Sequence, residues 1–404
     1  MRFAKELVAA LVLAVLGMPQ LASAQYSDRM IRIGVLADMS GVFADIQGPG
    51  DVVAARMAIE EFGGSVNNIP IELVSGDGQN RTDIGIALAR RWFDAERVDA
   101  IFGLANSAIA LGVQALGAER GRITVATSVG TTDLTARACS PTGAHWVYDN
   151  YALAAGTAAT ITQDGGRDWF FITSDYAFGH SLETNASAVV RANGGRVVGA
   201  VRAPLGATDF SSFLAQAAGS RAQVLGIAAA GADFQNIMKQ FAEFRLERRN
   251  LRPAALLALL TDVRALGPQV AQGLVFTEAY YWDQNDDTRA FADRFRARHG
   301  RPPTMFQAGT WSAVTHYLRA VQAAGSDDGP AVMERMRAMP INDFMTRNGR
   351  IREDGRVLRD MYLMRALPPD RVRGDWGLLE VVATIPPERA FRPLSATECP
   401  LVRQ

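Results

Sequence analysis

The sequence contains few residues of the kinds that bind metals or act as nucleophiles. Its 404 residues include only two cysteines and four histidines. Cys139 and Cys399 lie far apart and have no matching histidines, so they do not form a zinc-binding pattern. The histidines are scattered over different segments, where we expect surface or structural roles: His145, His180, His299 and His316. We therefore predict no metal and no cofactor.

Motifs of the common enzyme classes are also absent. The chain has no G-x-x-x-x-G-K-[ST] loop, no G-x-S-x-G nucleophile, no H-E-x-x-H motif and no EF-hand spacing. Gly76-Asp77-Gly78 follows the second predicted strand but lacks the third glycine of a dinucleotide-binding loop. The acidic run 283–287 is most simply a solvated loop. These absences favour a protein that is not an enzyme.

The chain also has no excess of positive or negative charge. Lysine plus arginine and aspartate plus glutamate number 42 each, and the formal net charge is 0. Without a basic block, the sequence does not favour nucleic acid as a partner. Beyond residue 24 the longest apolar stretch, 254–260, is far shorter than the about 20 residues of a membrane-spanning helix. Its length fits a buried strand.

The first 24 residues have the three parts of a secretory signal peptide. Arg2 and Lys5 give a basic start, residues 7–16 form a short apolar core, and Ala22-Ser23-Ala24 supplies small residues at a cleavage site. The apolar core is too short for a membrane anchor, which is the weaker interpretation. We expect cleavage after Ala24 and a periplasmic protein.

The chain that remains after cleavage suggests two domains, because single cores rarely grow beyond ~250–300 residues. In an exported protein a lone pair of cysteines is a disulfide candidate, so we predict a bond between Cys139 and Cys399. The alternative is two free thiols.

Apolar strands alternate with helices in the first part of the chain, which is typical of a parallel sheet covered on both faces. The pattern predicts strands at 30–36, 69–74, 100–103 and 123–126, and helices at 48–62, 82–95 and 107–120.

A second α/β unit starts near residue 150. Its predicted helices are 150–164, 181–193, 210–218 and 234–244, and its strands are 169–172, 196–201, 224–227, 254–260 and 274–277. Two further helices, 288–299 and 306–324, precede an expected antiparallel pair, 349–352 with 361–365, around Asp354-Gly355. Two successive units with a similar alternation of strands and helices predict an α/β fold with two similar lobes.

The loops that follow the strands are the candidate ligand site, because ligands of open α/β sheets bind beyond the carboxyl ends of the strands. These loops are rich in glycine and hydroxyl residues, including Ser107, Thr127 and Ser128. Hydroxyl groups and free backbone N–H groups at helix starts can hold a carboxylate without a salt bridge. The alternative is that these residues only cap helices.

Three aromatic residues, Phe43, Tyr176 and Phe178, lie in the same loops. Aromatic side chains offered by two lobes to one cleft would clamp an apolar or planar ligand. The alternative is ordinary core packing at a strand–helix junction.

Several stretches, in order along the chain, resemble the type I periplasmic binding proteins of the leucine/isoleucine/valine-binding class. The resemblance covers essentially the whole mature chain and rests on residues 33–36, 40–44, 54–62, 102–107, 173–179, 230–233, 261–263, 272–275 and 302–304. It implies two Rossmann-like, doubly wound lobes that are joined by three crossovers and close on a ligand. The implied lobes are 29–147 plus 279–348 and 148–278 plus 349–395, with hinges near Tyr148, Tyr280 and Asn348 and with the tail 396–404 tied by the disulfide.

The resemblance also implies roles for single residues. Ser107, Ser128 and the backbone of Gly130 would receive the ligand carboxylate, and Phe178 stands where the family often has a tyrosine. Amino-acid binders have an acidic residue after the strand predicted at 254–260. Asp262 follows Leu259 and Leu260 there, and it could equally be a helix cap. The full candidate set is Phe43, Leu104, Asn106, Ser107, Thr127, Ser128, Gly130, Tyr176, Phe178, Gly231, Asp233, Thr261 and Asp262.

The stretches 360–364 and 398–402 are similar to those of binders of aromatic acids. The sequence therefore predicts a monomeric solute-binding protein that captures a small carboxylate, preferably an aromatic acid, and delivers it to the permease subunits of an ABC transporter. The alternatives are binding of a branched-chain amino acid for transport, a ligand sensor for a membrane receptor and, last, an enzyme.

Overall fold

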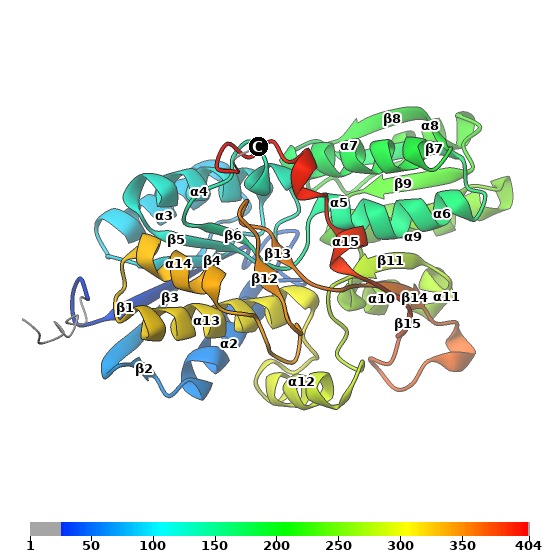
Figure 1. Ribbon diagram of the computed structural model, residues 1–404. Coiled ribbons are helices and arrows are strands. Elements are labelled where there is room, and N and C mark those ends of the chain that lie inside the picture. Colours follow the sequence, from blue (N-terminus) through cyan, green and yellow to red (C-terminus); the bar gives the residue numbers. More distant parts are fainter. Residues whose placement is uncertain (1–25, 403–404) are drawn as a thin grey trace, which may run out of the picture.

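The structure is a computed structural model that describes residues 26–402. The predicted signal peptide, with its cleavage site, lies outside this range. The described chain forms two α/β lobes, seen side by side in Figure 1. None of the helices within residues 26–402 combines the length and the apolar character needed to cross a bilayer.

The first lobe is built on a six-stranded sheet in the order β2-β3-β1-β4-β5-β6. β1 pairs in parallel with β3 on one side and with β4 on the other, and β5 and β6 continue the parallel arrangement. β1, β4 and β5 are buried along nearly their whole length, which is why they are continuous apolar runs. The strands are β1 (Ile31–Ala37), β2 (Ser65–Val66), β3 (Ile69–Asp77), β4 (Ala100–Gly103), β5 (Ile123–Ala126) and β6 (Gly143–His145).

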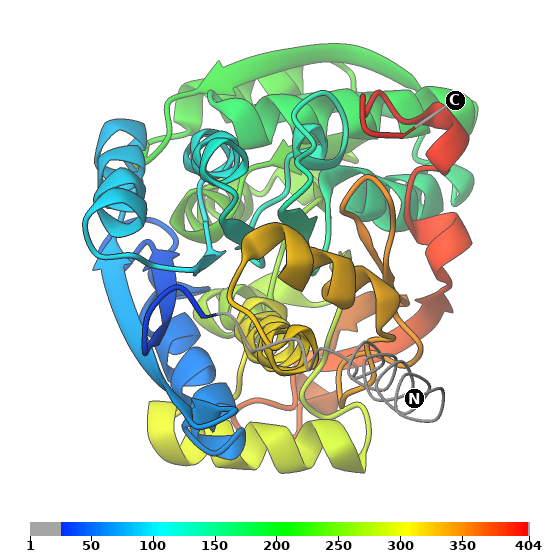
Figure 2. The ribbon, with the colours of Figure 1, turned by 60° about the vertical axis from the view of Figure 1, so that its left-hand side comes forward.

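Helices from two distant parts of the chain cover this sheet. α13 packs along α2, α12 also contacts α2, and α14 contacts β5. Figure 1 shows α13 and α14 on the side of the first lobe, and Figure 2 gives a second view of the same packing. The helices are α2 (Gly48–Glu61), α3 (Thr82–Asp94), α4 (Ser107–Arg120), α12 (Asp286–His299), α13 (Met305–Ala324) and α14 (Gly329–Ala338).

The second lobe contains a four-stranded parallel sheet, β10-β9-β7-β8, and a three-stranded antiparallel sheet, β11-β14-β15. The strands are β7 (Asp168–Ser174), β8 (Arg196–Ala203), β9 (Val224–Ala228), β10 (Arg252–Ala255), β11 (Val275–Glu278), β14 (Met361–Ala366) and β15 (Leu379–Ile385). The helices are α5 (Asn150–Leu153), α6 (Ala159–Gln163), α7 (Ala177–Ala192), α8 (Ser211–Gly219), α9 (Gly231–Glu243), α10 (Leu260–Leu266), α11 (Pro268–Ala271) and α15 (Pro387–Ala390).

The chain passes between the lobes three times. It crosses after β6, again between β11 and α12, and a third time between α14 and β14, where the short hairpin of β12 (Arg350–Ile351) and β13 (Val357–Leu358) lies between the lobes in Figure 1. The predicted α/β class with two lobes joined by three crossovers is confirmed. The residue limits of the two lobes stay a prediction.

The predicted disulfide is present. Cys139 and Cys399 are bonded, with their Cα atoms 5.7 Å apart, and the bond ties the tail to the segment before β6. The two cysteines are 260 residues apart in sequence, for which the chain-entropy model gives a stabilisation on the order of 5 kcal/mol, an upper figure.

The prediction of a strand at 254–260 is wrong in its second half. β10 ends at Ala255, and Leu260 already begins α10. The apolar run continues past the strand because the connecting residues, among them Leu257 and Leu259, are buried between the lobes and the second-lobe core. The loop at the carboxyl end of this strand therefore begins directly after Ala255 and not after Leu260.

The antiparallel pair expected between 349–352 and 361–365 is also wrong. β12 pairs with β13, while β14 pairs with β11 and β15. Gly355, with φ +86°, allows a tight turn that closes the hairpin immediately, so β14 is free to join the second lobe. The helix expected at 150–164 is present, but a π-helical segment, Ala154–Ala158, separates α5 from α6.

Candidate functional site

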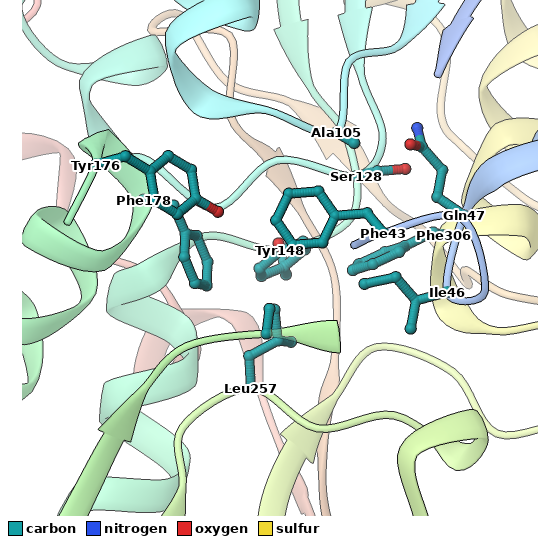
Figure 3. Close-up of a pocket in the computed structure, with 11 residues that line it drawn as sticks. Phe43, Ile46, Gln47, Ala105, Ser128, Tyr148, Tyr176, Phe178, Leu257 and Phe306 are labelled. Carbon is teal, nitrogen blue, oxygen red and sulfur yellow. The ribbon is translucent and has the colours of Figure 1, made fainter. Parts of the chain in front are cut away.

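A small cavity lies between the lobes, at the carboxyl ends of their parallel strands, where open α/β sheets bind ligands. The first lobe supplies loops after β1, β4 and β5, and the second lobe supplies loops after β7, β9 and β10. Figure 3 shows the lining side chains converging from both lobes. They are Phe43, Ile46, Gln47, Ala105, Ser128, Tyr148, Tyr176, Phe178, Ala230, Leu257 and Phe306.

Five aromatic rings dominate this cavity. The Phe43 ring of the first lobe lies 6.5 Å from that of Tyr176 in the second lobe, and Tyr176 lies 5.9 Å from Phe178, as ring-centroid distances. Tyr148, in the first crossover, stacks on Phe306 at 5.5 Å. The cavity has a volume of only about 10 Å³, so a planar ligand would fit only if these rings moved apart.

The loop after β1 is held in shape by a buried carboxylate. Asp38 accepts the backbone N–H groups of Gly41 at 2.8 Å and of Phe43 at 3.0 Å. These bonds satisfy a tight turn that would otherwise leave donors unpaired. They place the Phe43 ring next to the ring of Tyr176 in the second lobe.

Two glycines permit the lobes to approach closely. A Cβ atom on Gly231, which has φ +58°, would lie 2.4 Å from the carbonyl oxygen of Val42 in the opposite lobe. A Cβ atom on Gly130 would lie 2.2 Å from Asn150 and 2.7 Å from the ring of Phe178. Both predicted residues therefore act through their lack of a side chain.

Of the three predicted hydroxyl donors, only Ser128 lines the cavity. Ser107 opens α4 and is wholly buried, and its Oγ has no hydrogen-bond partner among the described residues. Thr127 Oγ1 lies 2.8 Å from Thr310 Oγ1 of α13. Both hydroxyls thus belong to the layer behind the cavity wall.

Asn106 and Leu104 have structural roles at the end of β4. Asn106 caps α4 by accepting the backbone N–H groups of Ala108 and Ile109. Leu104, with φ +67°, packs into a core cluster of the first lobe. Neither side chain is among those that line the cavity between the lobes.

The two predicted acids of the second lobe, Asp262 and Asp233, already accept hydrogen bonds from that lobe. Asp262 accepts the backbone N–H of Leu259 at 3.0 Å and the side-chain amide of Gln235 at 2.8 Å, so it caps α10. Asp233 accepts the backbone N–H of Gly206 at 3.1 Å and the hydroxyl of Ser174 at 3.3 Å. Burial raises the pKa of Asp262 to about 7 and that of Asp233 to about 6.

Thr261 and Asp262 lie outside the cavity lining, and Leu257 takes the place after β10 that faces it. The reason is the earlier end of the strand: the cleft-facing residue comes directly after β10, whereas Asp262 already stands within α10. Within residues 26–402, no group of three histidine, cysteine or acidic side chains could hold a metal ion.

Several lining residues were not predicted. Ile46 and Gln47 lie in a loop that the sequence indicated as a whole, but nothing distinguished them from their neighbours. Tyr148 and Phe306 reach the cavity from a crossover and from the start of α13, which requires knowledge of the tertiary fold. Leu257 was missed because the strand was predicted to end at residue 260, whereas β10 ends at Ala255.

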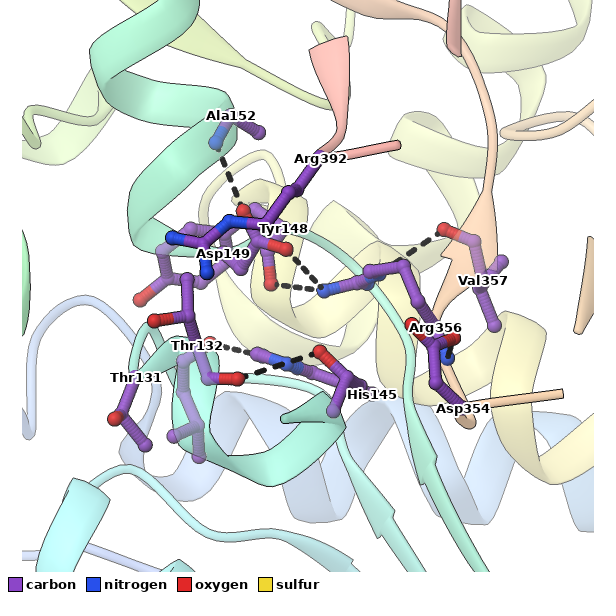
Figure 4. A network of polar contacts seen from close by, with 12 residues as sticks. Thr131, Thr132, His145, Tyr148, Asp149, Ala152, Asp354, Arg356, Val357 and Arg392 are labelled. Atoms are coloured by element: carbon purple, nitrogen blue, oxygen red, sulfur yellow. Dashed lines mark hydrogen bonds and ion pairs between the residues drawn. The ribbon is translucent and has the colours of Figure 1, made fainter. Parts of the chain in front are cut away.

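A buried polar network behind the cavity joins two crossovers (Figure 4). Arg356, wholly buried, donates through Nη1 to the carbonyl oxygen of Tyr148 at 2.7 Å and lies 3.6 Å from the carboxylate of Asp149. Asp149 in turn caps α5 by accepting the N–H of Ala152 at 2.8 Å. Burial lowers the pKa of Arg356 to about 10, with Asp149 opposing this shift. The network fixes the backbone of Tyr148, whose ring faces the cavity.

Comparisons with known proteins agree with this geometry. A family model described as periplasmic binding protein matches residues 30–370. A periplasmic binding protein from Burkholderia mallei is 45% identical, with a TM-score of 0.91, and the match covers 93% of this chain and 100% of that one. A branched chain amino acid ABC transporter periplasmic ligand-binding protein from Burkholderia xenovorans is 39% identical, with a TM-score of 0.82 and 92% and 99% covered. A Leu/Ile/Val-binding protein homolog from Brucella melitensis is 24% identical over 88% of this chain and 95% of its own length.

Proposed function

Because this chain belongs to the periplasmic binding protein family, we propose that it captures a small aromatic monocarboxylate between its lobes and delivers it to the permease subunits of an ABC transporter. The family and its solved members are binding proteins of transport systems and not enzymes. The family also indicates a periplasmic location.

The observation that carries the choice of ligand is the chemistry of the second-lobe wall. Leu257 faces the cavity after β10, and the two predicted acids, Asp233 and Asp262, accept hydrogen bonds from their own lobe. An ammonium group that enters such a wall loses its water and finds no carboxylate among the residues that line the cavity, which costs several kcal/mol. A planar apolar body instead gains contacts with the five aromatic rings.

The first lobe supplies the polar end of the site. Ser128 and Gln47 both line the cavity, and Gln47 Nε2 has no hydrogen-bond partner among residues 26–402. Two neutral donors can hold a carboxylate without an ion pair, so that binding stays reversible. We therefore assign the ligand carboxylate to Gln47 and Ser128, with Ser107 in the layer behind them.

Branched-chain amino acid binding is the second candidate. Curated relatives and similar structures carry amino-acid names, and Asp233 stands in the first turn of α9, shortly after Ala230, which lines the cavity. For an amino acid to bind, Asp233 would have to give up its bonds to Gly206 and Ser174 and turn to the ammonium group.

Delivery requires that the lobes open and close. We propose the lobes as residues 29–147 plus 279–348 and 148–278 plus 349–395, with hinges near Tyr148, Tyr280 and Asn348. The packing of α12, α13 and α14 on the first lobe supports this division. Ligand contacts made by both lobes would favour the closed state by differential affinity.

A thermal-shift screen tests the ligand class. The panel contains benzoate, hydroxybenzoates, leucine, isoleucine and valine, with the Leu257→Asp variant as a matched comparison. We expect the aromatic acids to raise the melting temperature of the wild type and leucine to leave it unchanged, whereas Leu257→Asp loses the response to benzoate. A wild type that responds to leucine alone would refute the proposal.

A further inference from the structure

A carboxyl group without an ionic partner lies behind the polar wall of the cavity. Asp51, in the first turn of α2, is wholly buried, and its Oδ2 lies 3.3 Å from Oγ of Ser128. Its Oδ1 has no hydrogen-bond partner among residues 26–402. Since Ser128 also lines the cavity, its hydroxyl group can contact both Asp51 and a ligand.

The charged groups of the surrounding elements are engaged elsewhere. Arg294 and Arg298 of α12 pair with Glu61 and Glu60 at the far end of α2. Arg56 of α2 and Arg319 of α13 are exposed. Most of the other charged groups on the neighbouring strands, loop and helix contact partners of their own: Arg32, Asp38, Asp45, Glu72, Asp77 and His316. Tyr317 of α13 is buried in the core.

No cation therefore offsets the burial of this carboxyl. Burial raises the pKa of Asp51 to about 7, and the nearby polar groups of Gln47, Ser128 and Thr310 oppose that shift. Asp51 thus changes its protonation state close to neutral pH while the rest of the wall stays uncharged.

The protonation state decides what Ser128 can offer to a ligand. Its hydroxyl has a single proton. With Asp51 ionised, that proton is donated to the Asp51 carboxylate, and only lone pairs face the cavity. With Asp51 protonated, the carboxyl O–H can donate to Ser128 Oγ, and the Ser128 proton is free for a ligand carboxylate. An ionised Asp51 also places a negative charge behind the site that receives the anion.

We propose that Asp51 couples ligand binding to proton binding, so that a ligand carboxylate binds to the form of the protein in which Asp51 carries a proton. This proposal rests on the proposed function, because it places the ligand carboxylate at Ser128. It predicts that binding of the anion takes up a proton from the solvent at neutral and mildly alkaline pH.

Calorimetric titration with benzoate tests the linkage. The wild type is titrated between pH 6 and 8.5 in two buffers of different ionisation enthalpy, which gives the number of protons taken up. We expect a Kd that is nearly constant below pH 6 and rises up to about tenfold per pH unit above pH 7, with uptake approaching one proton per benzoate. Asp51→Asn should bind benzoate with a pH-independent Kd and no proton uptake.

Asp99→Asn is the matched control. Asp99 is also buried, and burial raises its pKa to about 6, but it lies at the amino end of β4, away from the cavity. This variant should keep the full pH dependence of benzoate binding.

The outcomes are distinct. Benzoate that binds the wild type without proton uptake overturns the inference and leaves the proposed function intact, and this result does not depend on the folding of any variant. A pH dependence that survives in Asp51→Asn and disappears in Asp233→Asn assigns the proton to the second lobe and also overturns it. Benzoate that fails to bind at every pH overturns both proposals.

Discussion

Replacement of Gly231 by alanine should weaken ligand binding while the fold is kept. The backbone here has φ +58°, and the added Cβ would lie 2.4 Å from the carbonyl oxygen of Val42 in the other lobe. Ordinary contact starts at 3.4 Å, so the lobes must separate by about 1 Å at this point. The substitution therefore opposes closure directly.

Two interactions between the lobes set the size of this effect. Separation breaks the 3.3 Å bond from the N–H of Ala232 to Val42 O, worth about 0.5–1.5 kcal/mol. It also loosens the ring contact between Phe43 and Tyr176, worth about 0.5–1.5 kcal/mol. A loss of about 1–3 kcal/mol in the closed state corresponds to a Kd roughly 5- to 150-fold weaker.

Gly194→Ala separates this effect from backbone strain. Gly194 has φ +79°, and its added Cβ would meet nothing within 4 Å. Both variants carry the left-handed backbone penalty, on the order of 1–2 kcal/mol, but only Gly231→Ala obstructs closure. Calorimetry with benzoate and urea unfolding would be run on both variants. Equal benzoate affinities for Gly231→Ala and Gly194→Ala would refute the reasoning.

Three further predictions concern stability. Arg356→Met removes one partner of a buried ion pair and should lower the free energy of unfolding by about 3–5 kcal/mol. Adding Asp149→Asn to this variant should restore part of that loss, because the remaining buried charge is removed. Urea titrations that show no change in the free energy of unfolding of Arg356→Met would contradict this. Cys139→Ser with Cys399→Ser should lower the free energy of unfolding by up to about 5 kcal/mol, and thiol titration of the unfolded, unreduced wild type should find no free thiol. Because burial raises the folded-state pKa of Asp262 to about 7, its stabilising contribution is full below its unfolded pKa of about 4 and is lost as pH rises through 7. The wild type should therefore lose stability relative to Asp262→Asn between pH 4 and 7, and unfolding curves whose difference stays constant over this range would contradict the assignment.

The sequence alone predicted the fold where buried strands and capped helices have local signals. α4, β4 and β5 begin and end at the predicted residues, because Asn106 and Gly121 mark the helix ends and the strands are short apolar runs. The disulfide was also predictable, since only two cysteines are available.

The errors at the candidate site arose where burial is set by the other lobe. The run after Ala255 is apolar because it packs between the lobes, and sequence periodicity cannot distinguish such a segment from a strand. The same limitation concealed Tyr148 and Phe306, whose places in the cavity depend on a crossover and on the return of α13 to the first lobe.

The central claim is that the cavity accepts an aromatic carboxylate and rejects a zwitterion, and direct calorimetric comparison of benzoate and leucine tests it most directly. Titrations of the mature protein at pH 6, where Asp51 is largely protonated, should give a benzoate Kd at least tenfold lower than that of leucine, a difference of about 1.4 kcal/mol. Micromolar binding of leucine with no heat from benzoate would contradict the account and place an acid, Asp233 first among them, opposite the ligand ammonium group.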